Sequence, residues 1–244
     1  MTGRVDVVGL GPGDPGLWTA ETTAALAEAT DLVGYGPYVA RVPERPGLRR
    51  HVSDNREEIA RASDALKLAR DGGTVALVSS GDPGVFAMAA ALFEALETAP
   101  PPAPTDIRVL PGITAMLAAA ARLGAPLGHD FCAINLSDNL KPWALIERRL
   151  RLAAEADFAM AFYNPRSKAR PDGFVRTLEV LRETCGDDRI IAFARAVSSE
   201  EEHLRIETLG TAKPDMADMR TMVILGSSTT RAVGGWIYTP RSAS

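Results

Sequence analysis

The feature that most constrains the fold is an alternation between short apolar runs and longer alanine-rich stretches, repeated along the chain. Residues 4–10 (RVDVVGL), 74–79 (TVALVS) and 190–194 (IIAFA) are typical of buried strands. Residues 19–29 and 59–69 instead place alanine and leucine at helical spacing. Strands that alternate with helices predict an α/β protein.

Turn-forming stretches divide this pattern into two halves. Residues 124–128 (GAPLG) follow one complete set of elements, and a second set begins directly after them. We therefore expect two α/β domains, residues 1–124 and 125–244. Residues 98–105 contain four prolines and predict an exposed connection, while residues 36–51, with three prolines and four arginines, predict an irregular exposed segment.

Composition excludes several classes of protein. With 46% hydrophobic and 24% charged residues the chain is not a disordered one, and it has no apolar stretch of the ~20 residues that a transmembrane helix needs, so we expect a cytoplasmic protein. Two cysteines and three scattered histidines predict neither a disulfide framework nor a structural metal. The net charge of −4 argues against a nucleic-acid partner but is compatible with an anionic small molecule bound by local basic residues.

A glycine-rich loop, GPGDPG at residues 11–16, follows the first strand and fits the G-x-G-x-x-G dinucleotide pattern, with Asp31 about twenty residues on. A pyrophosphate site requires backbone N–H donors, which Pro12 and Pro15 lack. Asp14 adds a negative charge where a phosphate would bind. The alternatives are a tight turn with a purely structural role and a floor beneath a neutral or cationic ligand.

Two further loops of the same kind end other predicted strands. They are SSGDPGVF at residues 79–86 and PGITA at residues 111–115. Open α/β sheets bind their ligands at the carboxyl ends of the strands. Together, the three loops predict a ligand that is held mainly by backbone contacts.

These motifs, together with VGLGPGDPGLW at residues 8–18, resemble the S-adenosylmethionine-dependent tetrapyrrole methylase family over essentially the whole chain. Within the family, GAPLGHDFCAINLSD (124–138), FYNPRSK (162–168) and MVILGSSTTR (222–231) resemble the branch that methylates C17 of precorrin-3B and contracts the ring to precorrin-4 in cobalamin biosynthesis.

The resemblance implies two α/β domains with S-adenosyl-L-methionine in the cleft between them, S-adenosyl-L-homocysteine as a product, a tetrapyrrole substrate and a homodimer. Where the branch more often has Arg-Asn-Ala, this chain reads Arg195-Ala196-Val197. The cofactor contacts implied by motif matching are Pro12, Ser80, Gly81, Asp82, Val85, Thr114, Ala115, Asn164 and Val197.

Ring contraction needs a general acid and a general base as well as methyl transfer. The candidates are His129, Asp130 and Asp138, each of which is also compatible with a turn or surface role. Candidate contacts for the substrate carboxylates are Arg49, Arg50, Arg166 and Lys168, although exposed basic residues are often only solvated.

Other functions remain open from the sequence. A related methylase would act on another corrin carbon or on the cobalt-containing intermediate. A nicotinamide-dependent oxidoreductase would rest on the glycine motif alone, and a non-catalytic tetrapyrrole carrier would keep the basic residues without turnover.

Overall fold

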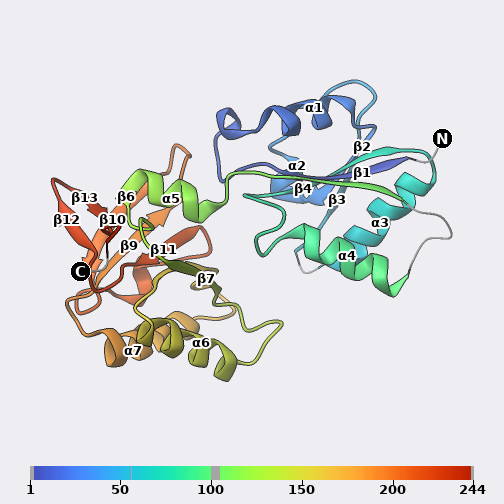
Figure 1. The fold of residues 1–244 in the computed structure, drawn as a ribbon. Coiled ribbons are helices and arrows are strands. Elements are labelled where there is room, and N and C mark those ends of the chain that lie inside the picture. Colours follow the sequence, from blue (N-terminus) through green and yellow to red (C-terminus); the bar gives the residue numbers. More distant parts are fainter. Residues whose placement is uncertain (1–2, 56, 100–104, 243–244) are drawn as a thin grey trace. The chain divides into compact units, whose positions relative to one another are not determined.

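The computed structural model describes residues 3–55, 57–99 and 105–242. The chain divides into two compact units, Met1–Ala115 and Met116–Ser244 (Figure 1). The boundary that we expected after residue 124 lies at the other end of helix α5 (Ala115–Leu123), which therefore belongs almost entirely to the second unit. Residues 100–104, within the expected proline-rich connection, lie outside the described residues.

The first unit is built on a five-stranded sheet with the order β3-β2-β4-β1-β5. All neighbouring strands are parallel, so their carboxyl ends meet at one edge of the sheet. The elements are β1 (Arg4–Gly9), α1 (Ala20–Glu28), β2 (Asp31–Tyr35), α2 (Gly36–Val39), β3 (Arg49–Ser53), α3 (Glu58–Arg70), β4 (Thr74–Ser79), α4 (Met88–Thr98) and β5 (Asp106–Leu110), with a 3₁₀ turn at Pro15–Leu17.

Helices cover both faces of this sheet, as Figure 1 shows. Val5 and Val7 pack in a core with α3 and α4, whereas Val8 packs in a second core with α1. This explains why β1 has valines on both faces. Its one buried charged residue, Asp6, accepts a hydrogen bond of 2.7 Å from Arg108 on the neighbouring strand. Helix α1 begins as expected, because the hydroxyl of Thr19 accepts a hydrogen bond from the N–H of Thr22 at 3.0 Å.

The second unit holds a mixed sheet with the order β10-β9-β11-β8-β7. Strand β7 is parallel to β8, and β11 is antiparallel to both β8 and β9, so the carboxyl ends of β7, β8 and β9 share one edge. The elements are β6 (Gly124–Ala125), β7 (Phe131–Asn135), α6 (Trp143–Glu155), β8 (Ala159–Tyr163), α7 (Gly173–Cys185), β9 (Ile190–Arg195), β10 (His203–Thr208), β11 (Thr221–Leu225), β12 (Arg231–Val233) and β13 (Trp236–Tyr238), with a 3₁₀ turn at Pro214–Met216.

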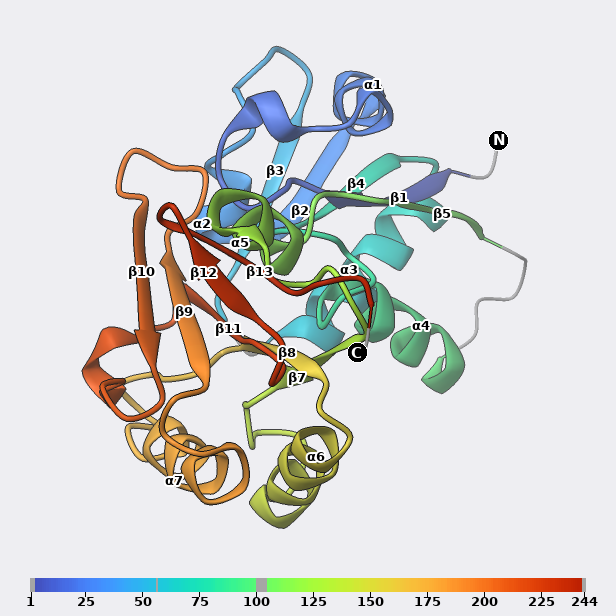
Figure 2. The ribbon, with the colours of Figure 1, turned by 60° about the vertical axis from the view of Figure 1, so that its left-hand side comes forward.

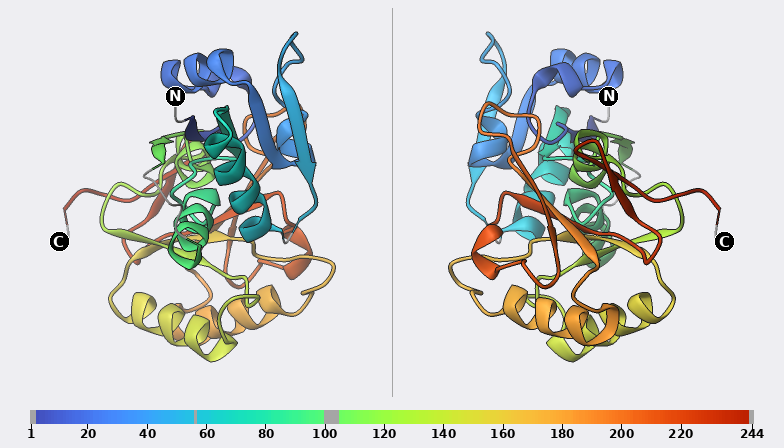
Figure 3. Two further views of the ribbon diagram at one scale, coloured as in Figure 1. Left: turned by 90° about the vertical axis from the view of Figure 1, so that its right-hand side faces the viewer. Right: turned by 90° about the vertical axis from the view of Figure 1, so that its left-hand side faces the viewer.

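Helices α6 and α7 cover one face of this sheet (Figure 3). Large apolar side chains fill the core on that face. Phe162 and Phe193 lie in that core, while alanines such as Ala161 and Ala192 are buried on the opposite face. Strands β12 and β13 form the hairpin seen in Figure 2, and β13 also pairs with β6. Gly124 is required there, because a Cβ would lie 2.5 Å from the carbonyl oxygen of Ile237.

Residues 36–51, which we expected to be irregular, contain the short helix α2 and the start of edge strand β3. We expected the irregular segment to extend to residue 51 because it contains three prolines. All three precede β3, so they do not interrupt the strand. Among the described residues, no helix is both long enough and apolar enough to cross a membrane.

Candidate functional site

Three loops follow three neighbouring strands of the first sheet, β4, β1 and β5. We call residues 10–19 the first loop, residues 80–87 the second and residues 111–114 the third. The parallel order brings all three to the carboxyl edge of this sheet, where open α/β sheets bind their ligands. The three loops predicted from the sequence thus lie together at one edge of the first sheet.

Glycines let the three loops approach each other through their backbones. Gly11 and Gly81 exchange two hydrogen bonds, of 3.1 and 3.0 Å, and both have left-handed φ angles, +61° and +66°. A Cβ on Gly112 would lie 2.3 Å from the carbonyl oxygen of Gly81, and one on Gly9 would lie 2.7 Å from the nitrogen of Gly112. Side chains are excluded at these points, so the loops form one backbone-built surface.

Aspartates fix the same loops. Asp82 accepts hydrogen bonds from the N–H groups of Gly84, at 2.8 Å, and Gly112, at 3.1 Å, and so ties the second loop to the third. Asp14 accepts one from the N–H of Gly16 at 2.7 Å. Five glycine N–H groups of these loops are thus already bonded within the protein, those of Gly11, Gly16, Gly81, Gly84 and Gly112.

This arrangement does not fit a dinucleotide. A pyrophosphate is bound by free N–H donors, whereas these five glycine N–H groups are used within the protein and two carboxylates lie among them. The carboxylates of Asp14 and Asp82 make the same surface better suited to a neutral or cationic group than to an anionic one. Seven of the residues matched to the cofactor lie on or directly after these loops: Pro12, Ser80, Gly81, Asp82, Val85, Thr114 and Ala115.

The arginine-rich segment is split between the two edges of the first sheet. Arg49 starts β3 and donates two hydrogen bonds to Asp31, of 2.8 and 2.7 Å, at the amino edge, opposite the loops. Arg50 donates to the carbonyl oxygens of Val39 and Val42 at 2.9 and 2.6 Å. The structure therefore does not bring Arg49 to the three loops, and its guanidinium already has a carboxylate partner.

Asp31 makes the stability of the first unit depend on pH. Its burial raises its pKa, but hydrogen bonds from Arg49, Thr30 and His51 outweigh this and lower the pKa to about 2. The folded pKa lies below the unfolded value, so the stabilisation is present above about pH 4 and is lost as the pH falls towards 2.

We expect Asp31→Asn to lower the free energy of unfolding by roughly 1–2 kcal/mol at pH 7. This range is smaller than the pKa shift alone would give, because solvent around the exposed Arg49 side chain screens its interaction with Asp31. Urea denaturation of the variant and the wild type should show this gap narrowing between about pH 4 and pH 2. A gap that stays constant over that range would exclude Asp31 as the source.

Two residues matched to the cofactor in the second unit lie at the carboxyl edge of its sheet. Asn164 follows β8 with φ +52°, and its Nδ2 donates to Oδ1 of Asn135 at 3.1 Å. Val197 follows β9, is 5% exposed, and lies between Ala196 and Ser198, which have φ values of +48° and +63°. Left-handed backbone at non-glycine residues is concentrated at functional sites, and it gathers at this edge.

Two further residues at this edge, Asn135 and Arg170, were not among the site residues predicted from the sequence. Asn135, at the end of β7, orients the Asn164 amide and also accepts from the N–H of Ser137 at 2.9 Å. Arg170 lies 4.0 Å from the carboxylate of Asp138. A polar residue at a strand end was the only available signal for Asn135, and nothing in the spacing distinguished Arg170 from its basic neighbours.

Arg166 and Lys168 follow the same strand as Asn164. The Nε–H of Arg166 is buried and has no hydrogen-bond partner within the described part of the chain, whereas the Lys168 side chain is exposed. A buried donor without a partner costs about 1–3 kcal/mol, so its retention favours a role in binding.

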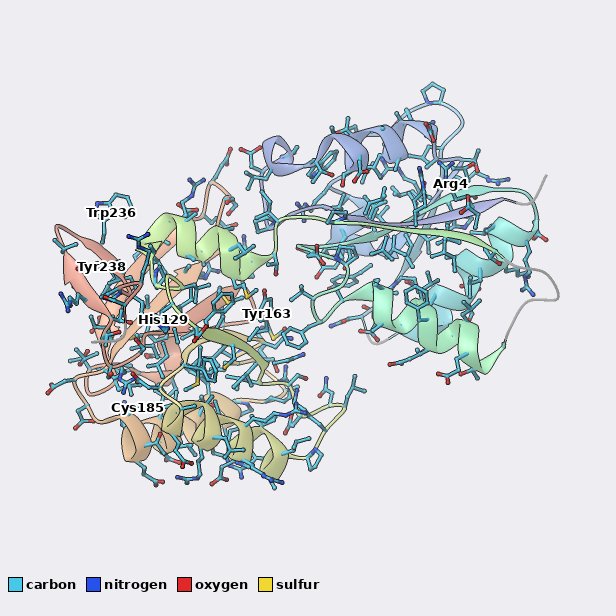
Figure 4. All side chains as sticks on the ribbon, in the orientation of Figure 1. Arg4, His129, Tyr163, Cys185, Trp236 and Tyr238 are labelled. Atoms are coloured by element: carbon cyan, nitrogen blue, oxygen red, sulfur yellow. The ribbon has the colours of Figure 1, made fainter. Side chains whose placement is uncertain are left out.

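His129 and Asp130 lie at the amino end of β7, and Asp138 follows its carboxyl end. The five residues of β7 span about 16 Å, so the three candidates for acid and base catalysis do not form one group, and Asp138 does not orient His129. Nδ1 of His129 accepts a hydrogen bond of 2.7 Å from the N–H of Asp130. Figure 4 shows His129 well separated from Tyr163, the last residue of β8.

Comparisons with known proteins agree with this description. A model of the Tetrapyrrole (Corrin/Porphyrin) Methylases matches residues 4–213. The chain is 51% identical to the precorrin-3B C(17)-methyltransferase of Sinorhizobium sp over 247 residues, which cover 99% of this chain and 97% of the relative. It is 48% identical to the cobalamin biosynthesis protein CobIJ of Mycobacterium tuberculosis, spanning 95% of this chain but only 46% of that protein.

Solved structures give the same result. The crystal structure of the methyltransferase CobJ matches with a TM-score of 0.96 and 64% identity, covering 98% of this chain and all of the other. A uroporphyrin-III C-methyl transferase from Thermus thermophilus, complexed with S-adenosyl homocysteine, matches with a TM-score of 0.69 and 24% identity, which supports the fold alone. The chain therefore belongs to the tetrapyrrole methylase family, and it is a methyltransferase.

Proposed function

We propose that this chain transfers the methyl group of S-adenosyl-L-methionine to C17 of precorrin-3B and contracts the ring to precorrin-4 in cobalamin biosynthesis. The observation that carries the proposal is the 51% identity to the Sinorhizobium enzyme of that name, over nearly the full length of both chains. The loops of the first unit support it, because a methyl transfer needs accurate positioning and no protein nucleophile. A carrier without activity would not need such a site.

For the cofactor, we propose contacts from the three loops and from Asn164 and Val197. When bound, S-adenosyl-L-methionine supplies an electrophilic methyl group on a sulfonium. The glycines exclude side chains at the points where the loops meet. The amide of Asn164 donates to Asn135, which leaves its own carbonyl oxygen available as an acceptor. These groups bind and orient the reactants, which is the main contribution a protein makes to such a transfer.

Calorimetry offers a direct test of the cofactor. S-adenosyl-L-homocysteine should bind the purified protein, and NADH should give no heat of binding, because the glycine N–H donors are already used. Binding of NADH in preference to the nucleoside would favour the oxidoreductase instead.

For the proton transfers of ring contraction, we propose Asp138, with His129 and Asp130 as the alternative. Asp138 lies at the same edge of the second sheet as Asn164 and Val197, beside Arg170, whereas His129 and Asp130 lie at the opposite end of β7. A group that moves a proton on the substrate has to reach it directly or through one water.

For the substrate, we propose that Arg166 binds a carboxylate of the macrocycle, with exposed Lys168 adding attraction. Arg166→Gln should raise the KM for the tetrapyrrole by roughly tenfold or more, since a charge-assisted hydrogen bond contributes about 1.5–3 kcal/mol. Arg166→Lys should recover only part of this, because the ammonium cannot make the same paired bonds. A KM unchanged in Arg166→Gln, measured by steady-state kinetics, would exclude the contact.

We further propose that the enzyme is cytoplasmic, since both proposed reactants are water-soluble metabolites. We also propose that it is a homodimer. A groove of about 380 Å³ in the second unit supports the dimer. Its wall includes Trp236, which is 55% exposed, and Ile206, and Val233 beside it is 60% exposed. Exposed apolar surface of this kind marks interfaces.

Sedimentation velocity should therefore give twice the chain mass, and Trp236→Lys should shift the protein to the monomer. A wild-type monomer at micromolar concentration would contradict the dimer.

A further inference from the structure

Arg41 holds a position unlike that of the other arginines in the segment 36–51. Its Nη2 donates hydrogen bonds to the carbonyl oxygens of Leu10, at 2.5 Å, and Gly13, at 3.0 Å. Its Nη1 lies 3.4 Å from the hydroxyl of Ser80. One guanidinium thus contacts the first loop on both sides of Gly11 and Pro12 and also reaches the second loop.

The charge of Arg41 has no carboxylate partner among the described residues. Burial lowers its pKa, and the nearby Tyr38 acts weakly in the other direction. A half-buried cation is unfavourable unless dipoles or a ligand compensate it, and here the two carbonyl groups of the first loop supply that compensation. The hydrogen bonds from Arg41 to the first loop therefore offset the free-energy cost of burying its charge.

The backbone that carries Arg41 is itself held in place. Arg41 follows the short helix α2, and its N–H donates to the carbonyl oxygen of Tyr38 at 3.1 Å. Arg50 donates to the carbonyl oxygens of Val39 and Val42, the residues on either side of this turn. Arg50, which we expected at the substrate, instead supports the turn from which Arg41 extends.

We propose that Arg41 is a positioning residue for the methyl-donor nucleoside, acting by holding the first and second loops in their binding geometry. The inference rests on the proposed cofactor and deepens it, since Pro12 and Ser80 are two of its proposed contacts. Without the guanidinium, the carbonyl groups of Leu10 and Gly13 lose their shared donor, and Gly11 and Pro12 between them gain freedom that binding has to remove.

The test is calorimetry with S-adenosyl-L-homocysteine on three full-length variants. Arg41→Gln should bind at least about tenfold more weakly than the wild type, because it loses charge-assisted bonds to two carbonyl groups. Arg41→Lys, which keeps the charge but only a single donor group, should fall between the two. In turnover, the KM for S-adenosylmethionine should rise by a similar factor while kcat changes by less than about threefold.

Arg45→Gln is the matched control. Arg45 also donates to two backbone carbonyl oxygens, those of Leu26 and Ala29, but at the end of α1, away from the loops. Both glutamine variants should lose stability in urea denaturation, and only Arg41→Gln should lose affinity for the nucleoside.

Equal affinity in Arg41→Gln and the wild type would overturn the inference and leave the proposed function intact. A wild type that does not bind S-adenosyl-L-homocysteine would instead overturn the proposed cofactor itself. Equal losses of affinity in the Arg41 and Arg45 variants would also overturn the inference, because they would indicate a general effect on the fold.

Discussion

Gly112→Ala should reduce the affinity for S-adenosyl-L-homocysteine about 100-fold. The new Cβ would lie 2.3 Å from the carbonyl oxygen of Gly81 and 2.9 Å from Cα of Gly9, so the third loop has to move away from the other two. These are backbone atoms, which cannot rotate aside as a flexible side chain would. Overpacking of this kind costs about 1–3 kcal/mol, and when binding requires the original loop position this cost corresponds to up to about 100-fold in affinity.

The variant should still fold, because overpacking of this kind costs about 1–3 kcal/mol and a domain of this size has about 5–15 kcal/mol of stability. Gly173→Ala is the control, since its new Cβ would meet no described atom within 4 Å beyond its chain neighbours and its own helix backbone. Calorimetry and urea denaturation on both variants separate binding from folding. Full affinity in a folded Gly112→Ala protein would show that the close approach of the loops does not form the cofactor site.

Asp138→Asn should slow ring contraction by about 10²–10⁴-fold, the usual contribution of a positioned acid or base. The change removes the titrating group and keeps the size of the side chain. Methyl transfer should be affected much less, because the contacts proposed for the cofactor do not include Asp138. Single-turnover analysis of products by mass spectrometry and NMR would resolve a methylated, uncontracted species.

His129→Ala is the companion variant, at the other end of β7. We expect it to change contraction by less than about tenfold, because His129 is bonded to the N–H of its neighbour and is distant from the edge that carries Asn164. The reverse result, with contraction lost in His129→Ala and kept in Asp138→Asn, would assign the proton transfer to the amino end of the strand.

Local patterns were sufficient to predict most of the fold. The strands β4 and β9 are apolar on both faces, and α1 has a threonine N-cap, so both kinds of element leave a signal within a few residues. The three glycine loops were also predictable, because only glycine fits where backbones approach within van der Waals contact. The cofactor and the branch of the family were predicted from the resemblance of the motifs, because hydrophobic periodicity contains no information about either.

Pairings between distant residues were not predictable. Arg41 and Arg49 are both arginines of the same proline-rich segment, and nothing in the local sequence distinguishes them. Arg41 nevertheless reaches the first loop, whereas Arg49 pairs with Asp31 at the opposite edge of the sheet. Such differences depend on strand direction and sheet order, which arise from long-range packing.

We expect this chain to transfer a methyl group to a macrocycle held beside the loops. The most direct measurement incubates the purified protein with precorrin-3B and S-adenosylmethionine labelled with ¹³C in the transferred methyl group, and then locates the label by NMR. We predict that the label appears at C17 of a ring-contracted product. Label at another carbon, or no transfer from a donor that binds, would contradict the account.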